Sequence, residues 1–124
     1  MTAKRVILDA CVPHRLRTAL HRFNVQTAHF AGLDRLDDRA LLVAIDGLFD
    51  VLVTLDHGML RQQRITGRRF GVVVMRVPVQ LPDVFAALAP TLIAAVKMVE
   101  SGQVRLVLHE PGGLDNWTHI TDLA

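Results

Sequence analysis

The chain has 124 residues and a formal net charge of +2, and 51% of its residues are hydrophobic. This length fits a single domain over residues 1–124 with a sizeable core and excludes two ordinary domains. No apolar run reaches the roughly 18 residues of a membrane span, so we expect a cytoplasmic protein without membrane contact. The one cysteine, Cys11, excludes an internal disulfide and suits a reducing compartment.

The first part of the chain alternates between extended and helical signals. Residues 6–8 form a continuous apolar run that is typical of a strand covered on both faces. Pro13 then suits the first turn of a helix, and residues 24–27 predict a second short strand. Residues 30–37 are expected to form a loop.

A second helix is predicted after this loop, with Asp37 as its N-cap and Gly47 at its fraying end. Its expected core-facing positions are Leu41, Leu42, Ile45 and Leu48. The apolar run 51–55 predicts the central strand, and the segment from Asp56 to Gly67 is expected to be a short basic helix or a loop.

The second half of the chain predicts a strand at 71–76 and the longest helix at 82–101. Pro90 lies inside this helix and predicts either a kink or two shorter helices. Gly102 is expected to cap its end.

Two further strands are predicted near the C-terminus, at 104–108 and 117–120. Pro111-Gly112-Gly113 lies between them, which favours an antiparallel hairpin at an edge of the sheet. The predicted fold class is therefore α/β: a three-layer sandwich with a mainly parallel sheet and a C-terminal edge hairpin.

Two acidic residues, Asp9 and Asp56, each follow a predicted buried strand. If those strands are neighbours in a parallel sheet, the two side chains meet in the crevice at the carboxyl ends of the strands. Two carboxylates ~5 Å apart repel by roughly 3 kcal/mol at an effective dielectric near 20, so such a pair shares a proton or holds a cation.

Asp38 is the candidate for a third carboxylate at this point. It stands in the first turn of the helix that follows the loop, and with Asp37 as the cap its side chain is free to turn towards the sheet. The alternative for either residue is a capping or dipole-favoured acid that contributes ~1 kcal/mol to stability.

Three segments together resemble a known family. Residues 6–13 read VILDACVP, residues 38–42 read DRALL, and residues 51–56 read VLVTLD. In this order and spacing they resemble the PIN-like DUF5615 family, which is related to Mut7-C domains and to the PIN nucleases. The resemblance spans about residues 4–77.

The resemblance implies a PIN-like sandwich in which Asp9, Asp38 and Asp56 bind Mg²⁺ or Mn²⁺ and are the catalytic residues. The implied activity is that of a metal-dependent endoribonuclease, the toxin of a toxin-antitoxin module, with RNA as substrate, a small antitoxin protein as partner and a homodimer as the assembly. Oxygen ligands suit these ions, and a bound metal lowers the pKa of a nucleophilic water.

The chain departs from the family pattern at three positions. Ala10 and Cys11 replace an acid and an amide after Asp9, and Gly58 stands where a further acid is usual. The alternative is therefore a catalytically degenerate PIN-like module that binds RNA or a protein partner without cleavage.

His57 follows Asp56 directly and could replace the lost ligand, which would favour manganese or zinc over magnesium. Cys11 lies two residues after Asp9, but a free cysteine without a histidine partner is more often a small buried hydrophobe. The remaining histidines have no metal-binding spacing: His14, His21, His29, His109 and His119.

Arginine makes up nearly all of the basic residues, and forked guanidinium groups are well suited to phosphate. The candidates for RNA contact are Arg15, Arg61, Arg64 and Arg68, and Arg69 continues the cluster. The alternative is a solvated helix face that keeps an apolar protein soluble. Trp117 could stack on a base, although an aromatic in an edge hairpin more often fills a core.

A response-regulator receiver is a third hypothesis, because Asp56 ends a central strand. Against it, the first strand is not followed by a pair of acids and no lysine ends a later strand.

Overall fold

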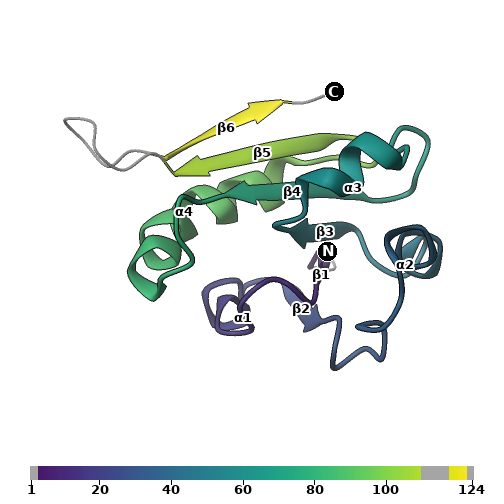
Figure 1. Cartoon of the computed structure of the whole chain (residues 1–124), viewed down its shortest axis with the longest axis horizontal. Coiled ribbons are helices and arrows are strands. Elements are labelled where there is room, and N and C mark those ends of the chain that lie inside the picture. The colour runs from purple at the N-terminus through teal and green to yellow at the C-terminus, as the bar shows by residue number, and fades with distance from the viewer. Residues whose placement is uncertain (1–2, 110–117, 123–124) are drawn as a thin grey trace.

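The computed structural model describes residues 3–109 and 118–122, and Figure 1 shows its strands and helices. The elements in chain order are β1 (Arg5–Leu8), α1 (Leu16–Ala19), β2 (Asn24–Thr27), α2 (Asp38–Ile45), β3 (Val51–Thr54), α3 (His57–Gln62), β4 (Gly71–Arg76), α4 (Pro82–Met98), β5 (Val104–His109) and β6 (Thr118–Asp122).

The strands form one sheet in the order β2-β1-β3-β4-β5-β6. The first five are mutually parallel, and β6 pairs antiparallel with β5 at the edge. β1 and β3 are neighbours, with Leu8 opposite Val53, so their carboxyl ends lie side by side. This pairing brings Asp9 and Asp56, which lie in the segments after the two strands, to the same end of the sheet, at the carboxyl ends of β1 and β3.

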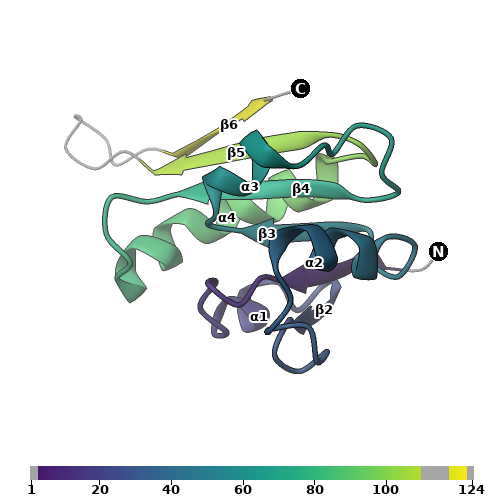
Figure 2. The same ribbon diagram turned by 45° about the vertical axis from the view of Figure 1, so that its right-hand side comes forward.

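Helices cover both faces of the sheet, as Figure 2 shows, which gives the three layers of the predicted α/β sandwich. The central strand β3 explains why: Val51 and Val53 belong to the core beneath α1 and α4, whereas Leu52 belongs to the core beneath α2 and α3. A strand buried on both faces needs a continuous apolar run instead of an alternating one. The predicted strands at 24–27, 51–55 and 71–76 are confirmed within a residue.

Two helix predictions need correction. Leu48 is not a core residue of α2: the helix ends at Ile45, and Leu48 is 61% exposed in the turn that follows. Likewise, α4 ends at Met98 instead of continuing to residue 101, and Gly102 lies in the turn before β5 with φ +81°. Pro90 lies inside α4, which the structure assigns as one helix. The alternative of two shorter helices is therefore wrong.

Near the C-terminus, the described parts of the two predicted strands pair antiparallel, with Val107 opposite Ile120, and β6 continues beyond the predicted end to Asp122. The predicted turn at Pro111-Gly112-Gly113 and the side chain of Trp117 lie outside the described residues. Among the helices that the structure describes, none has the length and apolar character needed to cross a bilayer.

Candidate functional site

Asp9 directly follows β1 and is held by the neighbouring strand. Its backbone N–H donates to the carbonyl of Val53 on β3 at 2.9 Å. One carboxylate oxygen, Oδ1, accepts from the backbone N–H of Ala10 at 2.8 Å, and the other, Oδ2, accepts from the Thr54 hydroxyl at 2.7 Å. Both oxygens are therefore oriented by hydrogen bonds, one from the segment after β1 and one from β3, although Asp9 remains partly exposed.

Thr54 joins the two strand-end acids. Its side chain is fully buried, and its hydroxyl donates to Asp9 while accepting from the backbone N–H of Asp56 at 3.0 Å. No role was predicted for Thr54 from the sequence. It is the only polar residue in the predicted strand 51–55, and because a buried hydroxyl needs hydrogen-bond partners, its presence in a buried strand indicates such partners.

Asp56 is the N-cap of α3, and its Oδ1 accepts from the backbone N–H of Met59 at 3.2 Å. Gly58 makes room for this arrangement, because a Cβ at that position would lie 3.2 Å from Oδ1 of Asp56. The side chain of Asp56 thus starts a helix and also remains partly exposed at the carboxyl end of β3.

Asp38 reaches the same place from α2. Asp37 is the N-cap, as predicted, and accepts from the backbone N–H of Ala40 at 2.8 Å, which leaves Asp38 to turn inward. Partial burial raises the pKa of Asp38, and the charges of Asp56 and Asp9 raise it further. Its carboxyl group is also within hydrogen-bonding reach of Asp56.

The structure therefore places Asp38 near enough to Asp56 and Asp9 for the charges of both to act on it. Within residues 3–109 and 118–122, however, no three His, Cys, Asp or Glu side chains form a ready-made metal-binding group. The donor chemistry fits a hard divalent cation, because all three acids offer oxygen ligands and their mutual repulsion is not neutralised. Water would have to complete the coordination.

The predicted ligand His57 lies beside these acids, and so does Cys11, which is exposed and not the small buried hydrophobe that its lack of a histidine partner suggested. His57 Nε2 is 3.3 Å from the carbonyl oxygen of Met75 on β4, so this nitrogen is directed at the backbone and only Nδ1 remains for a metal. Cys11 is exposed, and its Sγ lies 3.7 Å from both Oδ2 of Asp9 and Oγ1 of Thr54. Desolvation is the main cause that raises the pKa of the Cys11 thiol.

The predicted arginine cluster divides into two pairs. Arg61 and Arg64 line an open hollow of about 490 Å³ between α3 and β5. In contrast, Arg68 lies 3.9 Å from a carboxylate oxygen of Asp46, and Nε of Arg69 lies 3.2 Å from the other. The structure thus gives Arg68 and Arg69 an ion-pair partner in the turn after α2, which favours a structural role for them.

Arg15 stands apart from that cluster. It is the N-cap residue of α1 and lines a largely apolar hollow between α1 and the start of α4. The structure does not bring it to the hollow that Arg61 and Arg64 share.

A further hollow, of about 730 Å³, opens beside Asp9 at the carboxyl ends of β1 and β2. It is bounded by the segment after β1 and by the loop after β2. Its lining includes Asp9, Cys11, His14, His29, Phe30 and Asp34. No site residue was predicted in the loop at 30–37, although Phe30 and Asp34 of this loop line the hollow.

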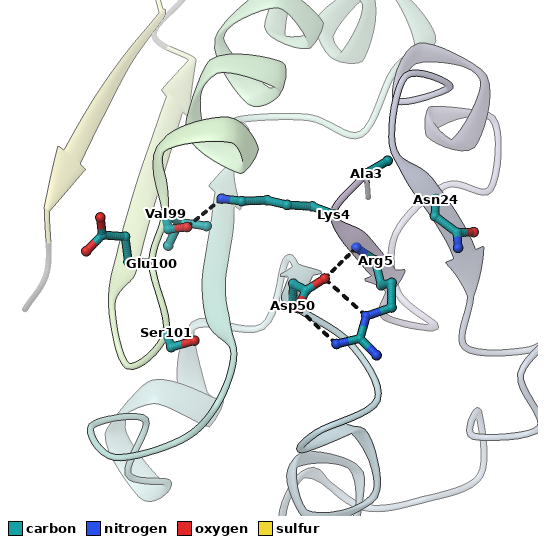
Figure 3. A pocket seen from close by; sticks show the side chains of 8 residues that line it. All are labelled: Ala3, Lys4, Arg5, Asn24, Asp50, Val99, Glu100 and Ser101. Carbon is teal, nitrogen blue, oxygen red and sulfur yellow. Dashed lines mark hydrogen bonds and ion pairs between the residues drawn. The ribbon is translucent and has the colours of Figure 1, made fainter. Parts of the chain in front are cut away.

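The opposite end of the sheet carries another hollow, of about 740 Å³, which Figure 3 shows. Three of its charged side chains, those of Lys4, Arg5 and Asp50, have partners. Lys4 Nζ donates to three backbone carbonyls at the C-terminal end of α4, at 2.7 to 3.0 Å, and Arg5 binds Asp50 with Nη2 to Oδ1 at 3.1 Å. Volume alone therefore does not identify the functional end of this molecule.

Comparisons with known proteins give no assignment: no family model, no curated protein and no solved structure matches the chain.

Proposed function

We propose that this protein is a metal-dependent endoribonuclease of the PIN-like type, in which Asp9, Asp38 and Asp56 hold Mg²⁺ or Mn²⁺. The observation that carries the proposal is the position of Asp9 and Asp56 after two neighbouring parallel strands, joined through Thr54, with Asp38 near enough for both charges to raise its pKa. Excess negative charge gathered at the carboxyl ends of two neighbouring parallel strands favours a cation, and this edge is where open α/β sheets bind ligands.

In this proposal, the residues of the chain would have separate roles in metal binding and in RNA contact. Asp9, oriented by Thr54 and by the N–H of Ala10, would present an oxygen ligand in a fixed direction. A bound divalent cation would supply a water with a lowered pKa and would neutralise charge on the phosphate. Arg61 and Arg64 would contact the phosphates of an RNA strand along the adjoining hollow.

The PIN-like family assignment, the C-terminal edge hairpin and a role as the toxin of a toxin-antitoxin pair belong to the same proposal. The family, the toxin role, the small antitoxin partner and the homodimer rest on the resemblance of residues 6–13, 38–42 and 51–56. The hairpin rests on the pattern around Pro111-Gly112-Gly113, and the cytoplasmic location rests on the composition of the chain.

The second candidate is a PIN-like module that binds RNA or a protein partner without cleavage. Two observations favour it: the described residues contain no ready-made group of three metal ligands, and Ala10 and Gly58 stand where the family usually has acids. Divalent-cation binding separates the two candidates, because only the nuclease requires it.

The test is a calorimetric titration of Mn²⁺ into the wild type, Asp56→Asn and a control, Asp83→Asn. Asp83 is an exposed acid in the first turn of α4, so its replacement changes the net charge equally. The proposal expects binding by the wild type and Asp83→Asn and at least about a 100-fold loss in Asp56→Asn, since a ligand removal should exceed the 10- to 100-fold effect of an outer-shell change. Manganese-dependent cleavage of a random-sequence RNA pool would then establish the nuclease. No binding by the wild type would leave the binding module.

A further inference from the structure

The hollow beside Asp9 has a wall that the metal site does not use. Asp9 forms one side of it, and the loop between β2 and α2 forms the other through His29, Phe30 and Asp34. Its volume of about 730 Å³ lies within the range of ligand-binding clefts. Because Asp9 itself lines the hollow, any chain that crosses the three acids has a direct path into it.

Phe30 is the most exposed of the large hydrophobic side chains that the structure describes, at 74%. The loop that presents it is nevertheless fixed by hydrogen bonds. The backbone N–H of Phe30 donates to the hydroxyl of Thr27 at 3.1 Å, and that of Ala28 donates to the carbonyl of Leu8 on β1 at 2.8 Å. The ring is thus held on a firm backbone, at the cost of leaving apolar surface in water.

His29 and Asp34 lie on this wall beside the ring of Phe30 and contact each other. Nδ1 of His29 lies 3.1 Å from Oδ2 of Asp34, and its hydrogen bond to Asp34 is the main cause that lowers the pKa of this carboxyl group. The His29 side chain is 88% exposed, so its ring also offers a flat face to an occupant.

We propose that this hollow is a base-binding subsite for single-stranded RNA, in which Phe30 stacks on a base next to the phosphate held at the acids. The inference rests on the proposed function, because it places the RNA backbone at Asp9. An RNA strand is favoured over a protein partner because the hollow is concave, is lined by Asp9 and carries two exposed rings, and every base has a face for stacking.

Equilibrium binding of an adenosine decaribonucleotide, with one 2-aminopurine as the fluorescent base, tests the subsite. The titration is made in Ca²⁺, to limit cleavage, with the wild type, Phe30→Ala and Phe30→Trp. We expect Phe30→Ala to weaken binding by about 10-fold and to abolish the stacking change in 2-aminopurine fluorescence, whereas Phe30→Trp retains both. Val43→Ala is the matched control, because Val43 is 60% exposed on α2 and does not line the hollow.

Cys11 provides a second readout, since it is exposed, lines the same hollow and is the one cysteine of the chain. Saturating decamer should slow alkylation of Cys11 by N-ethylmaleimide in the wild type, and the same decamer concentration should protect it less in Phe30→Ala.

The outcomes separate this inference from the metal site. Equal RNA affinity in the wild type and Phe30→Ala overturns the subsite, whatever the calorimetry with Mn²⁺ shows. Mn²⁺ binding without any binding of the decamer also overturns it, and makes Phe30 a candidate for docking a protein instead. Loss of Mn²⁺ binding in Phe30→Ala would mean that the variant disturbs the acids, and would equally contradict an independent subsite.

Discussion

The two ends of the parallel sheet differ in whether their charged side chains have partners of opposite charge or polarity. At the amino end, the Lys4 ammonium donates to the backbone carbonyls of Val96, Lys97 and Val99, and Arg5 forms an ion pair with Asp50. Figure 3 shows the bond to Val99 and the pair of Arg5 with Asp50. At the carboxyl end, the charges of Asp9 and Asp56 act on Asp38, and within residues 3–109 and 118–122 none of these three acids forms an ion pair with a basic side chain.

The pKa values record this difference. The hydrogen bond from Arg5 is the main cause that lowers the pKa of Asp50, whereas burial and the neighbouring acids raise that of Asp38. Paired charge stabilises a fold, while like charges held together lower stability and are retained where a ligand uses them. The comparison therefore assigns a structural role to the amino end and a binding role to the carboxyl end.

The largest effect is expected from Thr54→Val, which keeps the shape of the side chain and removes the hydroxyl between Asp9 and Asp56. Leaving a buried N–H and a carboxylate without this partner should reduce the free energy of unfolding by about 1–3 kcal/mol. Mn²⁺ affinity should fall by about 10- to 100-fold, as for other groups that orient a metal ligand. Urea denaturation and calorimetry measure the two effects.

Thr54→Ser is the control for this experiment, because it retains the hydroxyl. It should bind Mn²⁺ nearly as the wild type does. Equal affinities for the valine and serine variants would show that Thr54 does not position the acids.

An effect of similar origin but confined to stability is expected at the amino end from Lys4→Met. The variant keeps most of the apolar stem and removes a charged donor from the carbonyls of Val96, Lys97 and Val99. We expect the free energy of unfolding to fall by about 2 kcal/mol, within the range for hydrogen bonds to charged groups, with no change in Mn²⁺ affinity.

Lys97→Met is the matched variant, since Lys97 is an exposed lysine in the last turn of the same helix. Its unfolding midpoint in urea should move by less than that of Lys4→Met. A change in Mn²⁺ affinity in Lys4→Met would contradict the assignment of a purely structural role to the amino end of the sheet.

The smallest effect is a gain in stability from Asp38→Asn in metal-free protein. The folded-state pKa of Asp38 is raised, so the folded protein keeps this proton to a higher pH than the unfolded chain, and stability is lost as pH rises through the folded pKa. Asparagine removes that loss, which we expect to be below about 1 kcal/mol for a partly solvated group. The advantage should be absent below the unfolded pKa and present at pH 7.

Asp37→Asn is the control, because it removes a charge from the same helix end while asparagine can still cap. Thermal unfolding at a pH below the unfolded-state pKa of aspartate and at pH 7 compares the two variants. Added Mn²⁺ should raise the midpoint of the wild type and leave that of Asp38→Asn nearly unchanged. A variant that is less stable than Asp37→Asn at pH 7 would contradict repulsion at this site.

The sequence predicted the parts of the fold that depend on local pattern. Continuous apolar runs identified β1, β3 and β4, and the same runs located Asp9 and Asp56 at strand ends. Leu48 was assigned to a core because it continues a helical spacing, but α2 stops at Ile45, before that residue. Spacing alone does not reveal where a helix ends.

The parts that could not be predicted depend on which segments meet in space. Thr54 acquires its role from the register of β3 against β1, and Arg68 and Arg69 find their partner in a turn before β3. The hollow behind Phe30 exists because the loop after β2 is hydrogen-bonded back to β1. These contacts join segments that are distant in the sequence, so the periodicity of a single segment does not predict them.

The most direct test of the central claim is anomalous diffraction from crystals of the wild type soaked in Mn²⁺, recorded at the manganese edge. The account predicts a peak bounded by the carboxylates of Asp9, Asp38 and Asp56, with water as the remaining ligands, and no peak there in Asp56→Asn. A wild-type crystal without manganese at these three side chains, or with manganese bound only elsewhere, would contradict it.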